Sequence, residues 1–234
     1  MELLKITDKV YCFSFDQDKD YPNLGYVQGD SFSIAIDAGA SAAHLTLFYE
    51  QLKNRGLRLP ALTILTHWHW DHTFAMHAVH GLTIAAKATN EKLKLVKHWK
   101  WDKDSMEKRV SVGCEIPFCD EKIKQEYKNL CEIKVSEANL VFAGGFSIDM
   151  GGTMCEAIEV IAPHSKDSTI VYIPEQGIIF AGDAHNEDLY EPSINMDQDK
   201  RREYHDFLQN LDFSYYFSGH SAVKKKEEIL RILK

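Results

Sequence analysis

The sequence lacks any long hydrophobic run. No window of its 234 residues approaches the roughly 18 consecutive apolar residues that a membrane-spanning helix needs. The first residues, 1–9, carry charges throughout, whereas a secretory leader has an apolar core and a small-residue cleavage site. We therefore expect a soluble protein that is not exported and has no membrane partner.

The sequence has few cysteines, and their spacing forms no recognisable motif. The five cysteines are an odd number, and their scatter suits neither a disulfide framework nor a Cys-x-x-Cys zinc site. We expect free, mostly structural thiols in a reducing cytoplasm. They are Cys12, Cys114, Cys119, Cys131 and Cys155.

Positive charge is also in short supply. The 27 Lys and Arg face 35 Asp and Glu, which gives a formal net charge of −8. A general polyanion-binding surface needs the opposite balance, so we expect no nucleic-acid partner. The length suits one αβ domain over residues 1–234 and demands no second.

The first part of the chain predicts short strands and then a helix. Ser41 is a typical helix N-cap, apolar residues recur at helical spacing to about Asn54, and Gly56 lies just past that end. The apolar run 61–65 predicts a buried strand that leads directly into His67. The earlier strands are expected at 10–15, 24–28 and 31–36.

Residues 87–134 differ in composition from the rest of the chain. They hold twelve Lys or Arg against nine Asp or Glu, and look helical except around 113–117. We expect an insertion or lid on the main domain. One hypothesis is that Trp99 or Trp101 lines a substrate pocket, with nearby lysines favouring an anionic or polar substrate. The alternative is that these helices are solvated faces packed on a core, in which case the loops 16–23 and 185–193 would set specificity.

The later half returns to short strands. A strand–helix order that occurs twice predicts an α/β fold, with two stacked sheets flanked by helices. The strands are expected at 146–149, 156–161, 169–173, 177–181 and 215–217, and the helices near 199–210 and from Val223.

The segment Thr66–His72 carries the densest chemistry. Its sequence, Thr-His-Trp-His-Trp-Asp-His, places three imidazoles and a carboxylate immediately after the predicted strand. Imidazole nitrogens and carboxylate oxygens are the ligands that zinc prefers. In an extended segment His67 and His69 share one side while Asp71 and His72 turn to another, so one segment can serve two adjacent ions.

This motif resembles the hallmark His-x-His-x-Asp-His of the metallo-β-lactamase superfamily. The resemblance extends to an aspartate after an early strand and to later His, Asp and His residues in the family's order, which span most of the chain. These are Asp37 in Ile-Asp-Ala-Gly, His164 in Ala-Pro-His-Ser, Asp183 in Ala-Gly-Asp-Ala and His220 in Ser-Gly-His-Ser. The resemblance implies the αββα four-layer sandwich of that family.

Carried over residue by residue, the resemblance implies two adjacent divalent ions, with zinc first and iron or manganese as alternatives. The first ion would be held by His67, His69 and His164. The second would be held by Asp71, His72 and His220. Asp183 would bridge the two ions, and Asp37 would orient a ligand imidazole without touching metal.

Two ions that share a bridging water lower its pKa from about 15.7 toward 7 and supply a hydroxide at neutral pH. Asp71, a ligand beside that water, is the expected proton acceptor or relay. Tyr190 and Asn186 are close enough to Asp183 in sequence to offer a hydrogen bond to the oxyanion, unless they are plain turn residues. His185 is a candidate for the pocket rim.

Differences between this sequence and individual branches of the family narrow the set of expected reactions. β-Lactamases of this type lack the bridging aspartate and are exported, whereas Asp183 is present here. Glyoxalase II adds a helical C-terminal domain, but only residues 221–234 follow His220. We expect hydrolysis of a small-molecule ester, lactone or thioester. The alternatives are a phosphodiesterase, a sulfur dioxygenase with a single iron, and a metal-binding scaffold without turnover.

Overall fold

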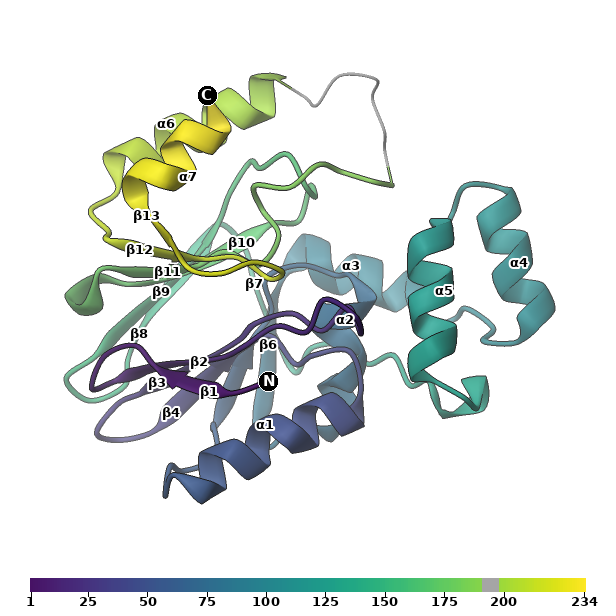
Figure 1. Ribbon diagram of the computed structural model, residues 1–234, viewed down its shortest axis with the longest axis horizontal. Coiled ribbons are helices and arrows are strands. Elements are labelled where there is room, and N and C mark those ends of the chain that lie inside the picture. The colour runs from purple at the N-terminus through teal and green to yellow at the C-terminus, as the bar shows by residue number, and fades with distance from the viewer. Residues whose placement is uncertain (191–197) are drawn as a thin grey trace.

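The computed structural model describes residues 1–190 and 198–234. Two β-sheets stack face to face, and helices cover their outer faces (Figure 1). The first sheet has the strand order β1-β2-β3-β4-β5-β6-β7. Its strands are β1 (Leu3–Lys5), β2 (Val10–Phe13), β3 (Leu24–Gln28), β4 (Ser33–Ile36), β5 (Leu62–Ile64), β6 (Leu82–Ala86) and β7 (Leu140–Phe142).

The second sheet has the order β13-β12-β11-β10-β9-β8. Its strands are β8 (Gly145–Asp149), β9 (Met154–Glu159), β10 (Thr169–Ile173), β11 (Ile178–Phe180), β12 (Tyr215–Phe217) and β13 (Lys224–Lys225). Pairing is antiparallel except for the run β4 to β7 and the pair β11–β12, which are parallel.

Three apolar clusters hold the layers together. One lies between the sheets and includes Ile36, Ile64 and Phe180. Another packs α1 against the outer face of the first sheet through Phe48, and a third packs α6 and α7 on the second sheet. Burial on both faces of each sheet accounts for the four-layer αββα sandwich, as the sequence predicted.

The helices are α1 (Ala42–Asn54), α2 (Trp70–Thr73), α3 (Lys87–Val96), α4 (Lys103–Ser111), α5 (Pro117–Glu126), α6 (Gln198–Asn210) and α7 (Lys226–Leu233). Helix α1 begins as expected, because the Ser41 side chain accepts a hydrogen bond from the backbone N–H of His44. None of the helices among the described residues is long and apolar enough to cross a membrane.

Four strands were absent from the sequence prediction, and one of them, the two-residue β13, occupies the start of the helix expected from Val223. The edge strands β1 and β7 are three residues long and mostly exposed, so neither has a buried run to identify it. Strand β6 has four buried residues but no alternation. Segment 87–134 is helical, as expected, and forms α3, α4 and α5, with α4 and α5 at one side of the sandwich (Figure 1).

Side-chain hydrogen bonds join helix α5 to the loop before β3 and to the start of α1. Glu126 at its end accepts from the Tyr21 hydroxyl, with an O–O distance of 2.6 Å, and from the Ser41 hydroxyl. Tyr127 donates to the carbonyl of Ala40 at 2.8 Å. These contacts fix the C-terminal end of α5 against the loop before β3 and the residues that precede α1.

Candidate metal centre

The histidine and aspartate motifs meet at one end of the sandwich because they follow strands that run side by side. Parallel strands end at the same edge of a sheet. Asp37 follows β4 and His67 follows the neighbouring parallel strand β5. Asp183 follows β11 and His220 follows its parallel neighbour β12. Segments about 150 residues apart, Asp71 and His220, thereby come into direct contact.

Donor atoms from seven side chains fall into two groups. One group is His67, His69 and His164, and the other is Asp71, His72, Asp183 and His220. Within the first, His164 Nε2 lies 3.0 Å from His69 Nδ1. Within the second, Asp71 Oδ2 lies 2.9 Å from His220 Nε2 and 3.2 Å from His72 Nε2. The structure therefore brings together all seven residues that the resemblance implied.

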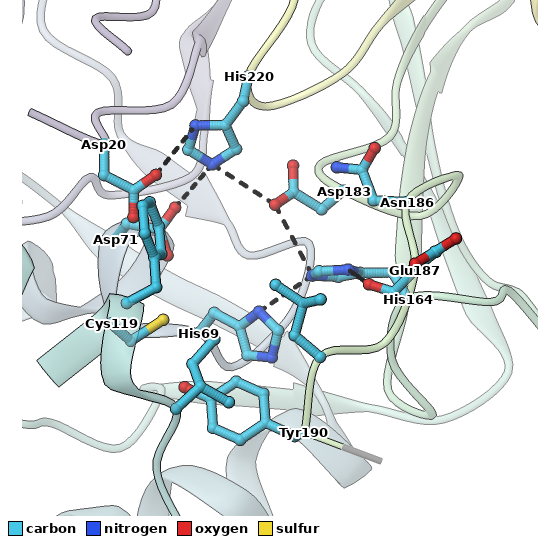
Figure 2. Close-up of a pocket in the computed structure, with 13 residues that line it drawn as sticks. Asp20, His69, Asp71, Cys119, His164, Asp183, Asn186, Glu187, Tyr190 and His220 are labelled. Atoms are coloured by element: carbon cyan, nitrogen blue, oxygen red, sulfur yellow. Dashed lines mark hydrogen bonds and ion pairs between the residues drawn. The ribbon is translucent and has the colours of Figure 1, made fainter. Parts of the chain in front are cut away.

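Asp183 stands between the two groups (Figure 2). Its Oδ2 lies 3.7 Å from His164 Nε2 in the first group. The same oxygen is 3.7 Å from His72 Nε2 and 3.4 Å from His220 Nε2 in the second. This is the position that a bridging carboxylate requires.

The outer nitrogens of the imidazoles have partners that orient the rings. Asp37 Oδ2 lies 2.7 Å from His72 Nδ1, as expected for a residue that acts through a ligand. The Thr66 hydroxyl donates to Asp37 and lies 3.1 Å from His67 Nδ1, so that nitrogen is the donor. The remaining contacts are His164 Nδ1 to the Glu187 carbonyl at 2.9 Å and His220 Nδ1 to Asp20 Oδ1 at 3.7 Å.

The inward-facing atoms fit a pair of metal ions. His67 Nε2 and His72 Nε2 are buried without a hydrogen-bond partner. Buried polar atoms in folded proteins are almost always satisfied, so two orphaned nitrogens in one cluster point to ligands that are bound there. Five imidazoles and two carboxylates are the donors that zinc and similar ions take.

The electrostatics of the cluster favour a cation. Burial lowers the pKa of His67 and His69 well below the usual value, so both rings are neutral and offer lone pairs. Burial also lowers the pKa of His220, but Asp183 and Asp71 outweigh it and raise that pKa to about 9. A metal ion bound there would displace this proton, because a ligating imidazole must be neutral.

Two glycines permit the close approach of the chain segments. A Cβ on Gly219 would lie 2.3 Å from Asp183 Oδ1 and 3.0 Å from His72 Cε1. A Cβ on Gly182 would lie 2.3 Å from the Thr66 hydroxyl oxygen, and Gly182 also has a φ of +50°. The Gly-Asp and Gly-His pairs thus let the loops after β11 and β12 meet.

Asn23 holds the His220 loop in place. Its Nδ2 donates to the carbonyls of Ser218 and Ser221, with N–O distances of 2.7 and 2.9 Å. Its Oδ1 accepts from the backbone N–H of Phe15 at 2.9 Å. One side chain therefore ties the loop after β2 to the loop after β12.

We expect Asn23→Ala to lower the free energy of unfolding by about 1–3 kcal/mol, because three backbone groups lose their partner. Metal binding should weaken as His220 loses its position. Urea unfolding and chelator competition measure the two effects. Asn210→Ala removes only an exposed hydrogen bond within α6 and serves as the control. Equal, small effects in both variants would contradict a positioning role for Asn23.

A cavity of about 370 Å³ opens onto the cluster. Apolar residues at the start of α5 and in the loop after β11 form much of its wall, so part of the 87–134 segment does cover the site. Asp20, Asn186 and Glu187 contribute polar groups, and Cys119 a thiol (Figure 2). The apolar lining residues are Ile116, Phe118, Leu189 and Tyr190.

The hypothesis that Trp99 or Trp101 lines the pocket is wrong. Both indoles pack against the core, and the Arg109 guanidinium lies 4.7 Å from each ring centroid. Trp101 also contacts Phe74 edge-on. The two tryptophans hold α4 in place, because a cation between two aromatic faces is attracted to both.

Two other expectations need correction. The Tyr190 ring lies against His69, but its hydroxyl contacts Glu115 Oε1 at 2.6 Å, so this hydroxyl is not aimed at an oxyanion. His185 is not at the pocket rim, because its ring packs edge-on against Tyr216. Asn186 does line the cavity, and Asp20 is a lining residue that the sequence prediction missed.

Known proteins resemble the chain in sequence pattern and fold. The family model described as the metallo-beta-lactamase superfamily matches residues 18–220. A metallo-beta-lactamase from Pontibacter korlensis superposes with a TM-score of 0.68 at 17% identity, covering 99% of this chain and 98% of that one. The DIM-1 metallo-beta-lactamase gives 0.66 at 15% identity, covering 100% and 97%.

The stereoselective inverting sec-alkylsulfatase Pisa1 from Pseudomonas sp. gives a TM-score of 0.68 at 13% identity, covering 99% of this chain and 40% of that one. No curated protein matches significantly. At these identities the structures show a shared fold, whereas the family model spans most of the chain. The chain belongs to the metallo-β-lactamase superfamily and is a metal-dependent hydrolase of that family.

Proposed function

We propose that the protein is a two-metal hydrolase that cleaves an ester, lactone or thioester of a small molecule. The observation that carries this proposal is the convergence of seven donor side chains in two groups, with Asp183 between them. A single-iron dioxygenase of this superfamily would use two histidines and one aspartate of the same motif. The number of metal ions per chain therefore discriminates between the two reactions.

Zinc is the first candidate, with manganese and iron as alternatives. Two such ions would lower the pKa of a shared water and polarise the scissile carbonyl. Asp71 lines the cavity and is buried, so its carboxylate is placed to orient the attacking water and to accept its proton. The Asn186 side chain faces the same cavity and can donate a hydrogen bond to the oxygen on which charge develops.

Reconstitution with zinc tests the proposal. We expect two ions per chain by mass spectrometry, and turnover that a chelator abolishes and added zinc restores. His67→Ala should reduce both, because His67 Nε2 is a buried donor without a protein partner. His98→Ala is the matched control, since His98 is exposed and lies outside both donor groups.

The substrate panel is 4-nitrophenyl butyrate, γ-butyrolactone, a butyryl thioester, bis-4-nitrophenyl phosphate and a chromogenic cephalosporin. We expect the carboxyl esters or the lactone to give the highest kcat/KM. One ion per chain at saturating zinc would overturn the two-metal assignment. Preference for the phosphodiester or the cephalosporin would overturn the proposed reaction.

A further inference from the structure

The cavity above the metal cluster has a charge pattern that restricts what can bind there. Apart from the histidines, all of its ionisable lining residues are acidic or a thiol, and no lysine or arginine lines it among the described residues. A smaller cavity of about 190 Å³, which has lysines in its lining, shares His69 and Tyr190 with the first. There Lys92 lies over the Trp68 ring, 4.6 Å from its centroid.

Asp20 places a further carboxylate beside the metal ligands. Its side chain is 15% exposed and its Oδ1 lies 3.7 Å from His220 Nδ1. Its backbone has a φ of +57°, a left-handed conformation that few non-glycine residues adopt. Together with Asp71 and Asp183, it places three carboxyl groups around the cavity. No lysine or arginine among the described lining residues is available to pair with a second anionic group of a substrate.

The wall opposite the cluster is apolar and partly open to solvent. Phe118, the second residue of α5, is 49% exposed, and Leu189 in the loop after β11 is 52% exposed. Ile116 and the Tyr190 ring complete the wall. Two large exposed hydrophobic side chains on one rim, next to a polar reaction centre, are typical of a site that binds the apolar part of a small molecule.

We infer that the substrate carries an apolar acyl or alkyl group of several carbons, and that the part outside the scissile bond is neutral or cationic rather than anionic. The apolar group lies against Ile116, Phe118 and Leu189, and the described lining of the cavity offers no lysine or arginine for a second anionic group. This inference rests on the proposed function, because it describes the substrate of the same hydrolytic site. It departs from the hypothesis that lysines of segment 87–134 favour an anionic or polar substrate, because none of them lines the cavity.

A matched set of thioesters tests the inference. The acyl group is acetyl, butyryl or hexanoyl, and the leaving thiol carries a hydroxyl (2-mercaptoethanol), a trimethylammonium (thiocholine) or a sulfonate (2-mercaptoethanesulfonate). For the zinc-loaded protein we expect kcat/KM to rise by up to about fourfold per methylene added to the acyl chain. The sulfonate series should be at least about tenfold slower than the neutral and cationic series.

Two substitutions separate the apolar and the charge effects. Phe118→Ala should flatten the chain-length dependence, because kcat/KM falls more for the hexanoyl than for the acetyl thioester, while the zinc content stays unchanged. Leu189→Lys should raise kcat/KM for the sulfonate series by about tenfold relative to the neutral series. Leu95→Lys is its control, because Leu95 is 64% exposed on α3 and does not line the cavity.

The outcomes distinguish this inference from the proposed function. If kcat/KM does not change with acyl chain length, or if the sulfonate-bearing thioesters are preferred, the inference is overturned while metal-dependent hydrolysis still stands. If no ester, lactone or thioester is cleaved, the proposed function fails. Calorimetric titration of the uncleaved hexanoyl thioesters then decides the inference separately: weaker binding of the sulfonate than of the neutral ester upholds it, and equal or stronger binding overturns it.

Discussion

Asp183→Asn is expected to lower turnover by at least about a hundredfold and to reduce zinc to less than two ions per chain. The Asp183 carboxylate lies between the two donor groups, with Oδ2 3.7 Å from His164 Nε2 and 3.4 Å from His220 Nε2. Asparagine keeps the shape but removes the charge, and its amide presents N–H groups that cannot bind a cation.

The fold should survive the substitution. Burial raises the pKa of Asp183, but His220, His72 and His164 outweigh it and hold that pKa well below its usual value. Removing this charge changes the local balance more than the packing. Circular dichroism and mass spectrometry of the zinc-loaded protein check fold and metal content, with the exposed Asp212→Asn as control. Wild-type zinc content and rate in Asp183→Asn would show that Asp183 does not bridge.

Asp37→Asn is expected to weaken zinc binding by about 10–100-fold without unfolding the protein. Asp37 Oδ1 accepts from the Thr66 backbone N–H at 2.8 Å, and Oδ2 faces His72 Nδ1 at 2.7 Å. An asparagine oxygen would keep the first bond, so its amide N–H would face His72. The imidazole must then accept at Nδ1 and carry its proton on Nε2, the atom that should bind metal.

Asparagine is the informative substitution because Asp37 has a φ of +64°, a conformation that asparagine tolerates well. Competition with a chromophoric chelator measures zinc affinity, and long-range proton–nitrogen NMR spectra report the protonated nitrogen of His72. Asp30→Asn, an exposed site in the turn between β3 and β4, is the control. Undiminished zinc affinity, or a proton still on Nδ1, would contradict this role of Asp37.

Much of the fold was predictable because its patterns are local. Ser41 and Gly56 mark the ends of α1, and β3 and β10 have the bounds expected from short apolar runs between turn residues. The edge strands β1 and β7 were missed for the converse reason. Their pairing partners, rather than their own composition, make them strands.

The dense motif from His67 to His72 suggests metal binding without long-range information. The ligands His164, Asp183 and His220 were named through the resemblance to the metallo-β-lactamase superfamily. The residues that line the cavity could not be predicted from the sequence in this way. Asp20 lies in an acidic loop typical of a solvated turn, and only the packing of that loop against His220 makes it part of the site. Trp99 and Trp101 had the more conspicuous side chains, yet Ile116 and Phe118 line the cavity.

The difference between the predictable metal ligands and the unpredictable cavity wall has a physical basis. The identity of a metal ligand is set by its own donor atom and by the strand that precedes it, both of which are written in a few consecutive residues. A pocket wall is set by how α5 and the loop after β11 pack against segments far away in sequence, through contacts such as Tyr21 with Glu126 and Tyr190 with Glu115. The sequence by itself thus determined the chemistry of the centre, and the tertiary structure decided which side chains surround it.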